Sequence, residues 1–413
     1  MKILIFCDMF PPAFAPRMGY LCKYMKRNGW EPVVITEYIP DNTFEFLAGN
    51  AEVTYVRYYH ASNKLIKQLE WLFIFIMDVC FHYKERKMIK VARKLLSKDK
   101  YDGVLCSVYR TFPLPAAQKV ASLYNIPFIA DTRDIIEQYA SNEYISRSFH
   151  TFNWLDKQIT RLYRWHLLKR RNIALHAADY ITTVSPWHVE RMKQFNKNVK
   201  LIYNGYDPEI FFPKQVHTTQ FRITYTGRLL SLAIRNPQLL FEAINKLSRE
   251  NTICPETFRV SWYIDKSSQN IIEEEAKKHD VIQYMDYHGY VPASEIPDIL
   301  NNSSVLLQLA NKASAKGPKG IMTTKLFEAF AVEKPVLCVR SDESYLEETI
   351  NKVHAGIAAK TSEEVYAFLQ YHYDEWKKKG YTTSLINREA LSVFSRCKQA
   401  EQFMELFKQI KDK

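Results

Sequence analysis

Short apolar runs alternate with longer amphipathic stretches along most of the chain. In the first half the runs predicted as strands are Ile3–Phe6, Val33–Thr36, Val104–Cys106, Phe128–Ala130 and Tyr180–Val184. The second half repeats the pattern with Arg222–Tyr225, Arg259–Ile264, Ser304–Leu309 and Val336–Val339. Buried strands separated by helical segments are typical of parallel sheets covered by helices. The sequence therefore predicts an α/β fold.

The length of 413 residues favours two domains, because a single core rarely grows to that size. The boundary is expected at Tyr206–Thr219, where Pro208 and Pro213 precede a strand. We therefore expect domains at 1–205 and 206–390. Residues 391–413 form a charged helical pattern with apolar positions at Phe394, Phe403, Leu406 and Phe407.

The surplus of positive charge lies in the first half of the chain. Lys and Arg number 57 against 45 Asp and Glu, a net charge of +12. Residues 1–200 hold 30 basic and 18 acidic residues, and the remainder holds 27 of each. We expect an acidic partner for the first domain. Nucleic acid is not expected, because no binding motif accompanies the charge.

Seven cysteines are scattered from Cys7 to Cys397 without a paired or metal-ligand spacing. Such a set favours a reducing compartment over a disulfide framework or a zinc site. The start of the chain, MKILIFC, is expected to form a strand and not a signal peptide. A cytoplasmic protein is the expectation.

Two segments combine apolar, aromatic and basic residues. Trp71–Met77 is apolar throughout and is followed by a basic stretch from Lys84 to Lys94, and Trp154–Arg171 mixes both kinds. The first is well short of the ~20 residues that a bilayer requires. Each could lie on the acidic surface at the inner face of a membrane. The alternative is a core-facing helix with a solvated basic side.

The segment TTKLFEAFA, from Thr323 to Ala331, carries the clearest chemistry. Hydroxyl residues at a helix start leave backbone N–H groups free for an anion, and Lys325 adds a charge that the helix dipole disfavours there. Glu328, one turn later, could accept hydrogen bonds from a ribose. Together they suggest a nucleotide. The alternative is an ordinary helix cap with a solvated glutamate.

Further charged residues follow other predicted strands. Gly227 and Arg228 come after Arg222–Tyr225, with Arg235 nearby, and two arginines can bind phosphates bidentately. The alternative is an ordinary loop with exposed arginines. In the first half, Asp131, Arg133 and Asp134 follow a buried strand, so they must be ion-paired or face a cleft.

In their order and spacing these segments resemble glycosyltransferase family 4. The resemblance rests on TTKLFE at 323–328, TGR at 226–228 with RNP at 235–237, HGYVP at 288–292, NGYD at 204–207, ADYITTVS at 178–185 and DTRD at 131–134. It implies a GT-B fold: two facing Rossmann-like domains, with a C-terminal helix crossing back to the first.

The resemblance also implies roles for individual residues. Nucleotide-sugar contacts are expected from Gly227, Arg228, Arg235, Gly289, Tyr290, Thr323, Thr324, Lys325 and Glu328. Acceptor-side residues are expected to be Arg17, Asp131, Arg133, Asp134 and Ser185. Catalysis would rest on Arg228, Arg235, Lys325 and Asp134, with no metal and no cofactor. The chain departs from the family at Gly320, where many relatives have a donor-sugar glutamate, and at Glu333, where they have glycine.

The expected activity is transfer of a sugar, of the hexosyl type, from a UDP- or GDP-sugar to a glycan or lipid-linked acceptor. The resemblance implies retention of anomeric configuration and a setting in surface polysaccharide synthesis. The alternatives are a GT-B epimerase or phosphorylase, and a non-catalytic scaffold of the same fold.

Overall fold

The computed structural model describes residues 1–138, 153–312, 317, 319–341 and 343–412. The chain divides into two compact units. The first comprises Met1–Tyr203 and Gln399–Lys413, and the second comprises Asn204–Lys398. The units are described one at a time.

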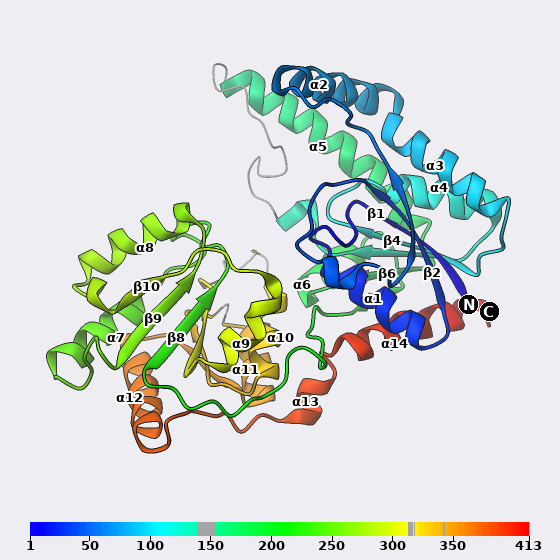
Figure 1. The fold of residues 1–413 in the computed structure, drawn as a ribbon. Coiled ribbons are helices and arrows are strands. Elements are labelled where there is room, and N and C mark those ends of the chain that lie inside the picture. The colour runs from blue at the N-terminus through cyan, green and yellow to red at the C-terminus, as the bar shows by residue number, and fades with distance from the viewer. Residues whose placement is uncertain (139–152, 313–316, 318, 342, 413) are drawn as a thin grey trace. The chain divides into compact units, whose positions relative to one another are not determined.

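The first unit is built on a seven-stranded sheet with the order β3-β2-β1-β4-β5-β6-β7, in which every neighbouring pair is parallel (Figure 1). The strands are β1 (Lys2–Cys7), β2 (Glu31–Glu37), β3 (Glu52–Val56), β4 (Gly103–Val108), β5 (Phe128–Thr132), β6 (Tyr180–Thr183) and β7 (Val199–Leu201). The helices are α1 (Pro16–Arg27), α2 (Lys64–Phe81), α3 (Tyr83–Leu96), α4 (Leu114–Tyr124), α5 (Asn153–His176) and α6 (Pro186–Met192).

The second unit contains a six-stranded parallel sheet with the order β10-β9-β8-β11-β12-β13. Its strands are β8 (Phe221–Thr226), β9 (Phe258–Tyr263), β10 (Met285–Tyr287), β11 (Val305–Leu309), β12 (Val336–Val339) and β13 (Gly356–Ala359). Its helices are α7 (Gln238–Arg249), α8 (Lys266–Lys278), α9 (Ile296–Asn301), α10 (Thr324–Ala331), α11 (Tyr345–Val353), α12 (Ser362–Lys379) and α13 (Arg388–Ser392).

The central strands are buried on both sides, as their apolar runs predicted. Residues 3–7 of β1 and 336–339 of β12 are inaccessible to solvent. Helices cover both faces of a parallel sheet, so successive side chains enter one helix-covered layer or the other. Four strands were not predicted, and they are the four sheet edges: β3, β7, β10 and β13. The partly exposed residues of these edge strands break the apolar runs.

The C-terminal segment crosses back to the first unit through α14 (Arg396–Lys411). The ring of Phe407 lies 6.3 Å from that of Trp30, and a Cβ on Gly103 would collide with it. Phe394, between α13 and α14, packs instead on Phe327 of the second unit, with ring centroids 4.6 Å apart. The two parallel sheets and the returning helix confirm the predicted GT-B architecture.

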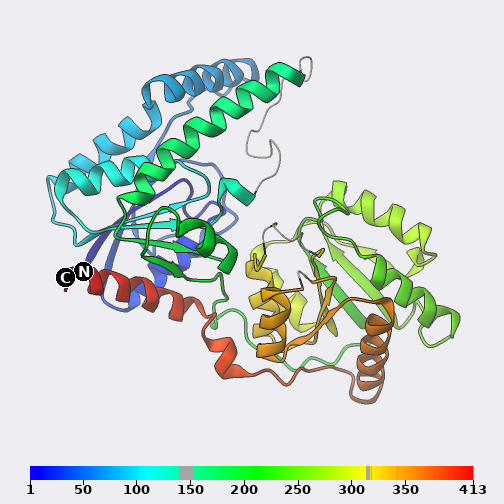
Figure 2. The same cartoon turned by 180° about the vertical axis from the view of Figure 1, so that it is seen from behind.

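The apolar segment Trp71–Met77 lies within α2, and the segment Trp154–Arg171 lies within α5. Figure 2 shows both helices at the periphery of the first unit, where α2 runs beside α5. Among the residues that the structure describes, none of the helices is both long enough and apolar enough to cross a bilayer.

Candidate active site

In the second sheet the order in which successive strands are added reverses at β8. Neighbouring strand β9 follows β8 in sequence, whereas β11 on its other side belongs to the later part of the chain. In doubly wound sheets ligands bind at such a point. Gly227 and Arg228 come directly after this strand. The motif predicted from the sequence is therefore at the expected edge of the sheet.

Gly227 allows Lys325 to approach the end of β8 closely. Its φ is +117°, a conformation that favours glycine, and a Cβ added there would collide with the Nζ of Lys325. Lys325 is in the first turn of α10. Two motifs almost 100 residues apart in sequence are thus in contact.

Arg228 and Arg235 join the same cluster. The carbonyl oxygen of Arg228 accepts hydrogen bonds from Nη1 of Arg235 and, at 2.9 Å, from the hydroxyl of Tyr225. The Nε of Arg228 donates to the Tyr290 hydroxyl at 3.0 Å, and Tyr290 donates to Asp265 at 3.1 Å. Arg228 keeps 68% of its side chain exposed. Its guanidinium is therefore held in place yet open to a ligand.

The electrostatics of the cluster favour an anion. Burial, helped by the nearby Arg235 and Arg228, lowers the pKa of Lys325 to about 8, and Glu328 opposes this shift. Burial raises the pKa of Glu328 to about 7, while Arg396 and Lys325 act in the other direction. Arg235 and Arg228 disfavour the charged form of Lys325, and a bound phosphate would favour it.

The start of α10 is not closed by its own threonine. Thr323 is the N-cap residue, but its side chain makes no capping hydrogen bond and is exposed. Thr324 follows as the first helical residue. The alternative of an ordinary threonine cap is wrong in this respect. The helix N-terminus adds its positive dipole to the cluster.

Two residues of the site were missed from the sequence. Asn311, just after β11, donates to the carbonyl oxygens of Leu232 at 2.9 Å and Ala233 at 2.7 Å, and accepts from the backbone N–H of Asn236 at 3.0 Å. It holds the loop that carries Arg235. Asp265 caps α8 by accepting from Ser268 N at 2.8 Å and orients Tyr290. The signal was a polar residue directly after a buried strand.

In the first unit, Arg17 and Asp131 form a buried ion pair. Arg17 Nε and Nη2 donate to the two carboxylate oxygens of Asp131 at 3.0 and 2.9 Å. Ser107 and Thr182 also donate to this carboxylate, at 2.9 and 2.8 Å, and Arg17 further donates to the carbonyl of Tyr203 at 2.9 Å. These contacts hold the pKa of Asp131 below its ordinary value, although burial acts against them. An acceptor contact for either residue stays a prediction.

The other residues that the sequence predicted for the acceptor side form a second group. Arg133 Nη2 donates to Asp8 at 2.9 Å. Asp134, whose pKa is raised by burial, accepts from Gln138 at 2.8 Å, and Gln138 lies 2.9 Å from Nε2 of His188. Burial lowers the pKa of His188 to about 4. Ser185 caps α6 by accepting from His188 N at 3.1 Å, so its hydroxyl has a structural role.

The two positions at which the chain departs from the family pattern are both left-handed, a conformation that favours glycine. Gly320 has φ +64°, a left-handed conformation that a glutamate would adopt only with strain. Glu333 itself is left-handed, with φ +55°, which explains why glycine is usual there. Its carboxylate accepts from Arg388 Nε at 2.7 Å and Nη2 at 3.1 Å. Gly289, also left-handed at φ +68°, precedes Tyr290 in the loop.

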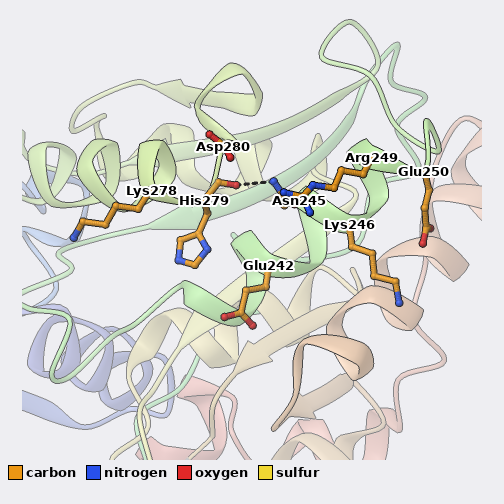
Figure 3. A pocket seen from close by; sticks show the side chains of 8 residues that line it. All are labelled: Glu242, Asn245, Lys246, Arg249, Glu250, Lys278, His279 and Asp280. Atoms are coloured by element: carbon orange, nitrogen blue, oxygen red, sulfur yellow. Dashed lines mark hydrogen bonds between the residues drawn. The ribbon is translucent and has the colours of Figure 1, made fainter.

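A separate hollow lies at the far end of α7 (Figure 3). It is lined by charged and polar residues, among them Glu242, Lys246 and Arg249, and Asn245 donates to the carbonyl of His279 at 2.9 Å. Because α7 runs from the carboxyl end of β8 back toward the start of β9, this hollow lies on the side of the sheet where the strands begin. Its lining does not include Arg228, Arg235 or Lys325.

Comparison with known proteins agrees with this architecture. Residues 17–210 match the model of Glycosyltransferase Family 4. Sucrose-phosphate synthase from Thermosynechococcus elongatus superposes with a TM-score of 0.62 at 13% identity, covering 100% of this chain and 99% of that one. HepE from Anabaena, solved in complex with UDP, gives 0.62 at 15% identity, covering 99% and 100%.

A putative UDP-N-acetylglucosamine 2-epimerase from Listeria monocytogenes also superposes, with a TM-score of 0.55 at 12% identity and coverage of 100% and 96%. A sequence comparison with curated proteins finds no match. The fold is that of GT-B proteins. The first unit resembles glycosyltransferase family 4, since the matched residues 17–210 lie almost wholly within it.

Proposed function

We propose that this glycosyltransferase moves a hexosyl group from a UDP- or GDP-sugar to a glycan or lipid-linked acceptor. The observation that carries the proposal is the meeting of Arg228, Arg235 and Lys325 at the end of β8, beside the N-terminus of α10. A departing nucleoside diphosphate is where negative charge develops during transfer. Fixed cations and a helix dipole at that place stabilise the transition state.

The mechanism we propose retains the anomeric configuration and requires no metal ion. The acceptor hydroxyl would attack the face of the sugar from which the diphosphate leaves. The departing phosphate oxygen would take the hydroxyl proton, so no side chain has to act as nucleophile. Glu328 would accept hydrogen bonds from the ribose. Asp134, with its raised pKa, is the carboxyl group that we assign to the acceptor side.

A setting in surface polysaccharide synthesis follows if the acceptor is lipid-linked. The distribution of charge along the chain supports this proposal, since the surplus positive charge of the first half would meet an acidic membrane surface. Peripheral attachment at the inner face of a membrane is part of the proposal.

The test is a panel of nucleotide sugars, screened first for a rise in melting temperature and then for release of free nucleotide. A ligand that binds the native state raises the melting temperature. We expect one UDP- or GDP-sugar to do so, and nucleotide release to require an acceptor. Conversion of the sugar without release would instead establish an epimerase. Absence of nucleotide binding would establish a scaffold.

A further inference from the structure

The exposed face of α2 is a continuous apolar stripe. It comprises Leu65, Ile66, Leu69, Leu72, Phe73 and Ile76, each between 48% and 71% exposed. Their spacing puts them on one side of a helix, and Ile74, on the opposite side, is 4% exposed. Soluble monomers rarely leave such a contiguous surface open, so the stripe indicates a binding surface.

The helix beneath the stripe is well formed. Asn63 caps its start by accepting from Leu65 N at 2.9 Å, and its end is marked by left-handed His82. Eighteen residues give a length of roughly 27 Å. Lys64 and Lys67, at its first turn, are exposed. The stripe thus lies on a regular helix whose start is capped.

The next helix, α3, exposes charge in place of apolar side chains. Arg86, Lys90, Arg93 and Lys94 are exposed at positions that share one helical face. Met88 and Ala92, on the other face of α3, belong to the same buried cluster as Ile74 of α2. Both exposed faces therefore point away from one core, and the helices follow one another along that side of the unit (Figures 1 and 2).

We infer that the α2 stripe inserts into the headgroup region of a bilayer that contains anionic lipids, while the basic face of α3 contacts their phosphates. An apolar ridge beside a basic face is the pattern of helices that lie in a membrane interface. A second copy of this chain fits less well. A two-fold interface through α2 would bring both basic faces toward each other, and like charges repel.

Helix α5 does not share this surface. Its exposed face carries Trp154, Leu162, Trp165 and Lys169. Tyr163, on its other side, meets Phe75 of α2, with ring centroids 5.5 Å apart. The side of α5 that packs on α2 is therefore not its exposed face. Of the two segments that the sequence made candidates for a membrane surface, insertion is assigned to the first, because the exposed face of α5 also carries the charged residues Arg161 and Lys169.

The test is sedimentation of the full chain with phosphatidylcholine vesicles that contain or lack phosphatidylglycerol. We expect binding to need the anionic lipid, and Leu69→Glu/Ile76→Glu to weaken it roughly 100-fold, since two inserted side chains are lost. Lys90→Glu/Arg93→Glu should remove the preference for phosphatidylglycerol. Matched controls are Leu162→Glu/Trp165→Glu on α5 and Leu385→Glu, which is 91% exposed in the second unit.

Three results would overturn the assignment: unchanged binding of the α2 variant, an equal loss in the α5 variant, or a wild-type dimer in light scattering that the α2 variant dissociates. An unchanged melting temperature establishes that the variants are folded. The inference stands independently of the proposed transfer, because vesicle binding is measured without a donor.

Discussion

Charged side chains gather at the strand ends of both sheets, but the two sets differ in how closely positive charges are paired with carboxylates. In the first unit Arg17 is paired with Asp131 and Arg133 with Asp8, at 2.9 Å in both cases. In the second unit Arg228, Arg235 and Lys325 lie close enough for the two arginines to lower the pKa of the lysine. Paired charges contribute to the fold, whereas crowded like charges mark a place where an anion is expected.

The largest effect expected from this comparison is on stability. Asp131→Ala would leave Arg17 buried without its partner, and breaking a buried pair in this way costs about 3–5 kcal/mol. Urea unfolding measures the loss. Asp265→Ala removes a partly exposed carboxylate that caps α8 and should cost about 1 kcal/mol. If Asp131→Ala kept its stability and lost only the transfer of sugar to the acceptor, we would conclude that Asp131 contacts the acceptor.

The next effect is on turnover. Lys325→Ala and Arg228→Ala should each lower turnover about 10²–10³-fold, the usual effect of removing one preorganised group that stabilises the transition state. The melting temperature should stay close to that of the wild type. Lys352→Ala, at an exposed position at the end of α11, is the control. Normal turnover of donor by both site variants would refute the proposal that Lys325 and Arg228 stabilise the departing diphosphate.

A smaller effect is expected from closing the space beside Lys325. Gly227→Ala puts a methyl group where the lysine amine lies, so we expect UDP affinity in calorimetry to fall about tenfold, or about 1.4 kcal/mol. Gly29→Ala is the matched control, because Gly29 has φ +75° but open space around it. Equal UDP affinity in the two variants would mean that Lys325 does not contact the diphosphate.

The smallest effect is on the pH dependence of binding. With a pKa of about 8, Lys325 loses its proton as the pH rises from 7 to 9, and a neutral amine attracts phosphate less. UDP affinity should therefore fall severalfold, up to about tenfold, over this range. In Lys325→Met the affinity should be lower, and the fall between pH 8 and 9 should be lost; only the titration of Glu328, whose pKa is about 7, would remain. An undiminished fall between pH 8 and 9 in this variant would assign the titration to another group.

Deprotonation of the same lysine affects the stability of the free protein with the opposite sign to its effect on UDP affinity. Its folded pKa lies below the unfolded value of 10.5, so the unfolded chain binds more protons between pH 8 and 10.5. This group alone makes the folded state more stable as the pH rises through that window. Binding and stability therefore respond to pH with opposite signs.

The sequence predicted the interior strands because each is buried along most of its length and is mainly apolar. It missed β3, β7, β10 and β13, since an edge strand is partly exposed and its pattern is broken. In the site, local motifs led to Gly227, Arg228 and Lys325. Asp265 and Asn311 were missed although each lies two residues after a buried strand, because their roles depend on contacts with a distant loop.

The sequence by itself determined the α/β class and the resemblance to glycosyltransferase family 4, because these depend on periodicity and on short motifs in a fixed order. It also determined the sum of charge in each half. Only the tertiary structure decided which charges are neutralised and which crowd together, and which apolar helix face stays uncovered. Those outcomes depend on distances between residues far apart in the chain, and folding alone sets such distances.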